Sequence, residues 1–161
     1  MDTFREIQLT QGKVAIVDAA DFEQLNRHKW YAHYAKCADT WYARRNVPGR
    51  PRSSEYMHNR ILETNLQVDH IDTDGLHNWR SNLRPATRSQ NLRNQSKRRG
   101  CRSRYKGVTW NEKKQRWIAR IQLDAGRKYL GSFPAEVDAA RAYNKAALEF
   151  FGAFARINQI N

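Results

Sequence analysis

The sequence is poor in cysteine and proline, and it contains no long hydrophobic run. Its 161 residues include only 2 cysteines, 4 prolines and 8 glycines. Cys37 and Cys101 lie far apart and form no Cys-x-x-Cys pair, which argues against a disulfide framework and against a thiolate zinc site. No stretch is apolar for long enough to form a transmembrane helix, and the first residues lack the apolar block of a secretory signal. We therefore expect a reducing, intracellular setting.

Negative charge is also scarce. Lys and Arg number 29 against 16 Asp and Glu, which gives a formal net charge of +13. Between Asp74 and Glu112 there is no acidic residue, although ten Lys and Arg residues lie in that interval. An excess of this size indicates a polyanionic partner, with nucleic acid first and an anionic membrane second. The length allows one domain or two small ones, each with a hydrophobic core.

The first 55 residues are predicted to be rich in β-structure. Ile7–Thr10 and Lys13–Val17 flank Gln11-Gly12, a pattern typical of a hairpin, and Trp41–Arg45 is a further strand. Other elements expected in this half are a short helix or turn over 21–30, a loop over 47–53 and a helix over 55–63. These residues either complete the core of the next unit or form an additional DNA-contacting sheet. The aromatic residues Trp30, Tyr31 and Trp41 are expected in a core.

From Tyr105 onward, the pattern predicts a three-stranded antiparallel meander followed by one helix. The strands are expected over Tyr105–Trp110, Arg116–Leu123 and Lys128–Phe133, and the helix over Ala135–Phe151. In the second strand, alternation places Trp117, Ala119, Ile121 and Leu123 on one side and Ile118, Arg120 and Gln122 on the other. Residues 96–103, which are dense in like charge, are predicted to be an extended basic linker that meets DNA phosphates.

Asp69 and His70 place a carboxylate beside an imidazole within Val68–Asp72. Metal-dependent phosphodiester hydrolysis needs an oxygen ligand for a hard divalent ion and a base with a pKa near neutral. A carboxylate suits the first role and an imidazole suits the second. A downstream amide such as that of Asn91 offers a second oxygen ligand. An isolated Asp-His pair is, however, more often structural than catalytic.

The whole stretch Val68–Asn94 resembles the ββα-metal core of H-N-H homing endonucleases in the order and spacing of its residues. The resemblance implies that His70 is the general base, that Asp69 and Asn91 bind the metal, and that Asn82 braces the loop and orients His70. It also implies that the Asp-His pair ends a first strand, that Asn-Leu-Arg opens a second, and that Ser-x-Asn begins a helix. His58 is expected to pack in a helix or contact phosphate, and His77 to be an exposed loop residue outside the site.

Four blocks in the region 103–158 resemble the AP-two/ERF DNA-binding domain, whose sheet lies in the major groove. These blocks are Ser103–Val108, Arg116–Ile121, Tyr129–Phe133 and Ala139–Ala147, and the closing segment from Phe150 to Asn158 fits as well. The resemblance and the basic residues between the modules together predict a set of DNA contacts. This set is Arg84, Arg88, Arg93, Lys97, Arg98, Arg99, Arg104, Lys106, Thr109, Arg120, Gln122, Arg127 and Tyr129.

The sequence therefore predicts an α+β protein with four parts. These are a β-rich region over 1–55, an H-N-H nuclease core over 56–95, a basic linker over 96–103 and an AP-two/ERF-like domain over 104–161. The leading hypothesis is a site-specific endonuclease for double-stranded DNA, a homing enzyme of a mobile intron or phage genome. It would use one Mg²⁺ or Mn²⁺ ion per site and nick one strand as a monomer, with a dimer as the alternative. The expected location is the cytoplasm of a bacterial or phage-infected cell, without a membrane partner.

Two other hypotheses remain open at the level of the sequence. One is a DNA-binding regulator without catalysis, in which the H-N-H unit has become structural. The other is an RNA-binding protein, because charge alone does not choose the polymer.

Overall fold

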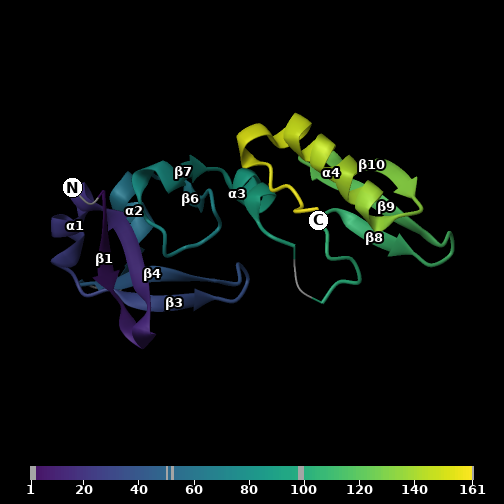
Figure 1. The fold of residues 1–161 in the computed structure, drawn as a ribbon. Helices are drawn as coiled ribbons and strands as arrows, with labels where there is room; N and C mark the ends of the chain where they lie inside the picture. Colours follow the sequence, from purple (N-terminus) through teal and green to yellow (C-terminus); the bar gives the residue numbers. More distant parts are fainter. Residues whose placement is uncertain (1–2, 50, 52, 98–99, 161) are drawn as a thin grey trace. The chain divides into compact units, whose positions relative to one another are not determined.

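The computed structural model describes residues 3–49, 51, 53–97 and 100–160 (Figure 1). The chain divides into two compact units, Met1–Asn91 and Leu92–Asn161, and each has its own hydrophobic core. Within the described residues there are four α-helices and ten short strands, and the strands form small antiparallel sheets. This combination is an α+β fold. In this part of the chain, no helix is both long and apolar enough to cross a membrane.

The first unit begins with the hairpin that the sequence predicts. Strands β1 (Phe4–Gln8) and β2 (Val14–Asp18) pair antiparallel, and the turn between them has left-handed backbone at Gln11 (φ 61°) and Gly12 (φ 64°). Helix α1 (Ala19–Asn26) follows directly and begins two residues earlier than predicted.

A three-stranded sheet comes next, in the order β3-β4-β5. Its strands are β3 (Tyr31–Ala35), β4 (Thr40–Val47) and β5 (Ser53–Tyr56). Strand β3 was not predicted, and β5 lies where the sequence pattern predicted the end of a loop and the start of a helix. Both strands are short, and each depends on pairing with β4 more than on its own residues. Helix α2 (Met57–Leu62) consequently begins two residues later than predicted.

The region around Asp69 and His70 folds as two strands and a helix. Strand β6 (Gln67–His70) pairs antiparallel with β7 (Leu83–Ala86), and α3 (Arg88–Asn94) follows. The connection over residues 71–82 contains a single 3₁₀ turn, Arg80–Asn82. Helix α2 and strands β6 and β7 share one core with the amino-terminal elements, because Ile7, Val17, Met57 and Leu83 belong to the same cluster of buried side chains.

The second unit is a three-stranded sheet covered on one face by α4 (Glu136–Phe151), as Figure 1 shows. The strands β8 (Val108–Asn111), β9 (Arg116–Leu123) and β10 (Gly126–Phe133) lie in the order β10-β9-β8. The first strand begins three residues later than predicted. The reason lies in Gly107, which has φ +77° and on which a Cβ would lie 2.0 Å from the ring of Tyr143.

Candidate functional site

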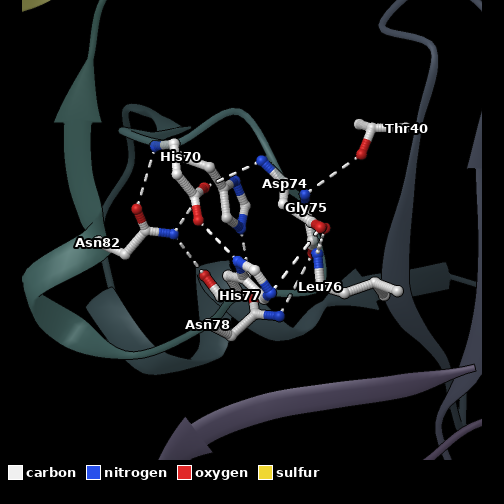
Figure 2. Close-up of polar contacts among 9 residues, drawn as sticks. Thr40, His70, Asp74, Gly75, Leu76, His77, Asn78 and Asn82 are labelled. Atoms are coloured by element: carbon white, nitrogen blue, oxygen red, sulfur yellow. Dashed lines mark hydrogen bonds and ion pairs between the residues drawn. The ribbon is translucent and has the colours of Figure 1, made fainter.

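The Asp-His motif lies at the end of strand β6, where β6 pairs with β7. Asp69 lies opposite Arg84 and His70 lies opposite Leu83 in the antiparallel register. Both Asp69 and His70 are buried, with 3% and 5% of their surface exposed. The loop over residues 71–82 then folds back over His70 (Figure 2).

Asn78 fixes the imidazole of His70. Asn78 is completely buried, and its Oδ1 lies 3.3 Å from His70 Nε2, while its Nδ2 donates to the Gly75 carbonyl at 3.3 Å (Figure 2). Because the carbonyl of Gly75 must face the amide nitrogen, the amide oxygen faces the ring. His70 Nε2 therefore carries the proton, and the neutral ring has its lone pair on Nδ1.

Aromatic rings surround His70. The centroid of its ring lies 5.7 Å from that of Tyr42 and 5.1 Å from that of His58. Burial in this cluster lowers the pKa of His70 below its ordinary value, although the hydrogen bond to Asn78 and the nearby carboxylates act in the opposite direction. The ring is thus held neutral at physiological pH, which is the state that a general base requires.

His58 lies behind the site as a buried, neutral packing residue. It stacks on Tyr56 with ring centroids 5.2 Å apart, and its surface is 8% exposed. Burial, with a further contribution from His70, lowers the pKa of His58 to about 3. Within the described residues, its Nδ1 has no hydrogen-bond partner. Of the two roles expected for His58, this burial favours helix packing over contact with phosphate.

Asn82 braces the loop that carries Asn78. Its Nδ2 donates to Asp72 Oδ1 at 3.0 Å and to the His77 carbonyl at 2.8 Å, and its Oδ1 accepts from the Asp72 amide at 3.1 Å. Asn82 therefore ties together the parts of the loop that contain Asp72 and His77. The amide that contacts the His70 ring belongs to Asn78 instead.

Asp72 and His77 form a second brace in the same loop. His77 Nδ1 lies 2.6 Å from Asp72 Oδ2, and the His77 ring packs on Trp79 with centroids 4.8 Å apart. Burial acts to raise the pKa of Asp72, but hydrogen bonds from His77, Asn82 and the Asp74 amide together lower it. The sequence analysis treated His77 as an exposed loop residue, whereas its side chain is only 33% exposed and is held by Asp72.

Gly75 lets strand β4 pack directly against this loop. A Cβ at Gly75 would lie 2.4 Å from both the Trp41 carbonyl oxygen and the ring of Tyr42. The Gly75 amide also donates to Thr40 Oγ1 at 3.3 Å (Figure 2). The amino-terminal sheet therefore supports the loop that orients His70, and this observation bears on the open role of residues 1–55.

Asp69 forms an ion pair with Arg84 across the two strands. Arg84 Nε and Nη2 approach Asp69 Oδ2 at 2.8 and 2.6 Å. Arg84 was expected to contact DNA, but its guanidinium pairs with the predicted metal ligand Asp69, and the Arg84 side chain is only 16% exposed.

Asn91 on α3 reaches the same face of β6 as Asp69. Its Nδ2 donates to Gln67 Oε1 at 3.3 Å, and Gln67 and Asp69 are alternate residues of β6, so their side chains leave the strand on one side. A carboxylate and an amide oxygen are suitable donors for Mg²⁺ or Mn²⁺, which complete their coordination with water and phosphate. Over residues 3–49, 51, 53–97 and 100–160, no three His, Cys, Asp or Glu side chains cluster to hold a metal. The donor chemistry of Asp69 and Asn91, a carboxylate and an amide oxygen, is what suits a hard ion with few protein ligands.

The second unit presents a polar face on the side of its sheet opposite α4. Arg120 pairs with Tyr129 and Gln122 pairs with Arg127, so these four side chains leave the sheet on the same side. All four are exposed, and Thr109 joins them from β8 through its pairing with Ile118. The alternate residues of β9, such as Trp117 and Ala119, pack toward the helix. The alternation read from the sequence thus gathers five of the expected DNA contacts on one surface.

The remaining expected DNA contacts have varied surroundings. Arg88 is exposed at the start of α3, while Arg98 and Arg99 lie outside the described residues. Arg93 pairs with Asp124 at 2.6 Å, and Lys97 Nζ donates to the Val108 carbonyl at 3.2 Å. Arg104 is exposed and lies over the ring of Tyr105. Lys106 is half-buried and does not lie on the exposed sheet face, because it precedes β8 and binds backbone carbonyls.

Three residues that shape the site were absent from the predicted set. Tyr42 contacts the ring of His70, Gly75 admits strand β4, and Asn78 fixes the imidazole tautomer. Asn78 lies within the same stretch, Val68–Asn94, that carries the resemblance, so it was visible in the sequence. Tyr42 carried no signal, because only the tertiary fold brings β4 to the loop.

One relative spans almost the whole chain. The chain is 30% identical over 155 residues to an uncharacterized HNH endonuclease of Acanthamoeba polyphaga mimivirus, and the match covers 94% of this chain and 78% of that protein. No protein-family model matches the chain.

Other relatives match a shorter stretch. The chain is 48% identical over 65 residues to APETALA2-like protein 2 of Oryza sativa subsp. indica, which is 38% of this chain and 15% of that protein. It is 50% identical over 50 residues to the AP2-like ethylene-responsive transcription factor AIL7 of Arabidopsis thaliana, which is 30% of this chain and 10% of that protein. The chain spans only a small part of these plant relatives.

Proposed function

Because the chain belongs to the HNH endonuclease family, we propose that it hydrolyses a phosphodiester bond of double-stranded DNA, with His70 as the general base. The observation that carries this proposal is the hydrogen bond between His70 Nε2 and the buried amide of Asn78. This bond holds the ring in one tautomer, and burial keeps the ring neutral.

In the proposed reaction, His70 Nδ1 takes a proton from a water molecule. The water oxygen forms a bond to phosphorus as the bond between phosphorus and the 3′ oxygen breaks. The 3′ oxygen leaves with the electron pair of that bond and takes a proton from solvent water, which gives a 3′ hydroxyl and a 5′ phosphate. Asn78 orients the base, while Asn82 and Asp72 hold the loop that carries Asn78. Asn78 and Asn82 are positioning residues in this scheme.

Asp69 and Asn91 would hold one divalent ion, Mg²⁺ or Mn²⁺. When bound, such an ion supplies positive charge to the phosphate and to the leaving oxygen. Arg84 already balances the buried carboxylate of Asp69 and would remain as a second cation beside it.

The exposed face of β8, β9 and β10 would bind duplex DNA in the major groove, which admits a small sheet. Arg120, Gln122, Arg127, Tyr129 and Thr109 would make the contacts. A DNA-binding face in one unit and a single catalytic site in the other fit a site-specific enzyme, such as a homing endonuclease of a mobile intron or phage genome. One catalytic unit cuts one strand, so a nick is the expected product of a monomer.

A supercoiled plasmid that contains a target selected from randomised duplexes tests this proposal. The parent protein should convert it to open circles with Mg²⁺ or Mn²⁺ and should leave it intact with EDTA. Asn91→Ala should lower the nicking rate at limiting metal by at least about tenfold. Asn59→Ala, which alters an exposed asparagine of α2, should match the parent.

A DNA-binding regulator without catalysis is the second candidate, and the stretch similar to plant transcription factors favours it. A parent protein that binds duplex DNA tightly but leaves the plasmid supercoiled with either metal would establish this alternative.

A further inference from the structure

A cationic cleft lies within the second unit, apart from the exposed sheet face. Its volume is about 250 Å³, and Lys97, Arg104, Lys106, Arg156 and Asn158 are among its lining residues. A water molecule occupies about 30 Å³ of the liquid, so the cleft has room for a hydrated phosphate group. Four of these five side chains are cationic, and the lining contains no acidic residue.

Asn158 fixes the two walls of the cleft to each other. Its Oδ1 accepts from the Lys106 amide at 2.6 Å, and its Nδ2 donates to the Lys106 carbonyl at 3.1 Å. The backbone of Asn158 is held in turn by the side chain of Asn144 on α4, at 2.7 and 2.9 Å. The segment that carries Arg156 is therefore anchored before any ligand arrives, which lowers the ordering cost of binding.

Positive charge is concentrated among the lining residues of the cleft, and the Glu136 carboxylate, which accepts from the Arg104 amide at 3.1 Å, is not among them. Lys106 Nζ donates to the carbonyls of Arg93 and Gln95, each at 2.6 Å, and it is surrounded by protein. Burial, together with repulsion from Arg156, lowers the pKa of Lys106 to about 8. Arg156 and Lys106 both line this cleft. An anion between or beside them would remove this repulsion.

Three arginines of the same unit have carboxylate partners. Arg93 pairs with Asp124, Arg102 with Glu112, and Arg141 with Asp138. Among residues 92–97 and 100–160, Arg156 has no such partner. Its positive charge is thus available to a ligand.

The lining also indicates which kind of anion fits. Tyr105 is the one aromatic side chain among the lining residues, but it is 3% exposed and Arg104 lies over its ring at 4.9 Å. The cleft therefore offers charge and hydrogen-bond donors but no open ring on which a base could stack. This composition suits a phosphate group and not a nucleobase.

We propose that this cleft binds a phosphodiester group of the DNA backbone, with Arg156, Arg104 and Lys97 as its ligands. The proposal rests on the proposed DNA-binding function and adds to it a contact that is independent of base sequence. The exposed sheet face would recognise the base sequence of the duplex, whereas the cleft would add affinity for a duplex of any sequence.

Binding of fluorescent duplexes to the full chain, measured over a range of salt concentrations, tests this proposal. Arg156→Gln should weaken binding about five- to tenfold for every duplex and reduce the slope of log K against log salt by about 0.9. Arg104→Gln should act in the same direction. Lys145→Gln, which removes the same charge from an exposed position on α4, should change neither quantity comparably. Thermal unfolding of each variant establishes that the unit is folded.

Two results would overturn the proposal. In the first, Arg156→Gln and Arg104→Gln are folded and match Lys145→Gln in affinity and slope. In the second, inorganic pyrophosphate saturates the cleft, as followed by the NMR signals of Arg156, and duplex DNA does not displace it. The cleft would then serve a free polyphosphate. A failure of the proposed nuclease is seen separately, as a parent protein that binds duplexes but does not nick them.

Discussion

At the scale of single residues, the site depends on a buried amide that holds an imidazole. Asn78 is completely buried, and both ends of its amide are hydrogen-bonded, one to His70 and one to Gly75. A side chain in that position sets the tautomer and the direction of the ring without touching DNA. His70 can therefore present Nδ1 in one orientation.

Replacement of Asn78 should separate orientation from binding. Asn78→Ala removes the acceptor for His70 Nε2, and we expect cleavage to fall about 10²-fold or more with unchanged DNA affinity. Asn78→Asp keeps an acceptor and adds negative charge, which raises the pKa of His70. The acid limb of its pH–rate profile should move to higher pH than in the parent, where burial lowers that pKa. Parent-like rates for Asn78→Ala, or an unmoved profile for Asn78→Asp, would show that Asn78 does not orient the base.

His58 makes the stability of the first unit depend on pH. Its pKa is about 3 in the folded protein against 6.5 for the ordinary side chain. A lowered pKa means that its contribution to the free energy of unfolding is complete above about pH 6.5 and is lost as the pH falls toward 3. The loss is roughly 1.4 kcal/mol per pH unit in that interval.

We expect His58→Gln, which cannot titrate there, to flatten this dependence. Denaturant unfolding of parent and variant between pH 4 and pH 8 measures the difference, and carboxylates shared by both proteins cancel. Equal pH slopes for the two proteins would contradict the assignment of a buried, neutral His58.

At the scale of elements, the sequence determined the second unit more fully than the first. The alternation of Trp117, Ala119 and Ile121 with Arg120 and Gln122 predicted β9 with its observed bounds. Strand β3 and the start of β5 were missed because their pairing with β4 stabilises them, and pairing across the chain leaves no local pattern.

The candidate site was predictable in part for the same reason. Asp69, His70, Asn82 and Asn91 lie close in sequence, and their spacing carried the resemblance. The ion pair between Asp69 and Arg84 follows from strand register, which the sequence alone did not fix. Tyr42 and His70 are in contact although they lie 28 positions apart in the sequence.

Gly75 tests the link between strand β4 and the catalytic loop. A Cβ there would overlap the Trp41 carbonyl and the Tyr42 ring at 2.4 Å. We expect Gly75→Ala to lower the free energy of unfolding by about 1–3 kcal/mol and to reduce cleavage, because the loop bearing Asn78 must move.

Gly12→Ala is the matched control for this prediction. Its Cβ would meet open space, and it has φ +64°, so only the left-handed backbone disfavours alanine, by about 1 kcal/mol. It should leave cleavage unchanged. If Gly75→Ala cleaves DNA like Gly12→Ala, then β4 does not support the site.

At the scale of the whole molecule, two units divide the work that the proposed reaction requires. The first holds the Asp-His motif beneath a sheet, and the second carries an exposed polar sheet face and a cationic cleft. The net charge of +13 supplies long-range attraction to a polyanion. Binding and cleavage should therefore be separable by mutation, because different units contain the residues for each.

The central claim is that His70 is the general base. The most direct test measures single-turnover nicking of a target plasmid by His70→Ala, together with duplex binding by the same preparation. His28→Ala, at a half-buried histidine outside the site, is the control. The account predicts that His70→Ala binds DNA like the parent and loses at least about 10²-fold in nicking rate, whereas His28→Ala keeps both properties. A folded His70→Ala protein that nicks DNA with Mg²⁺ at the parent rate would contradict it.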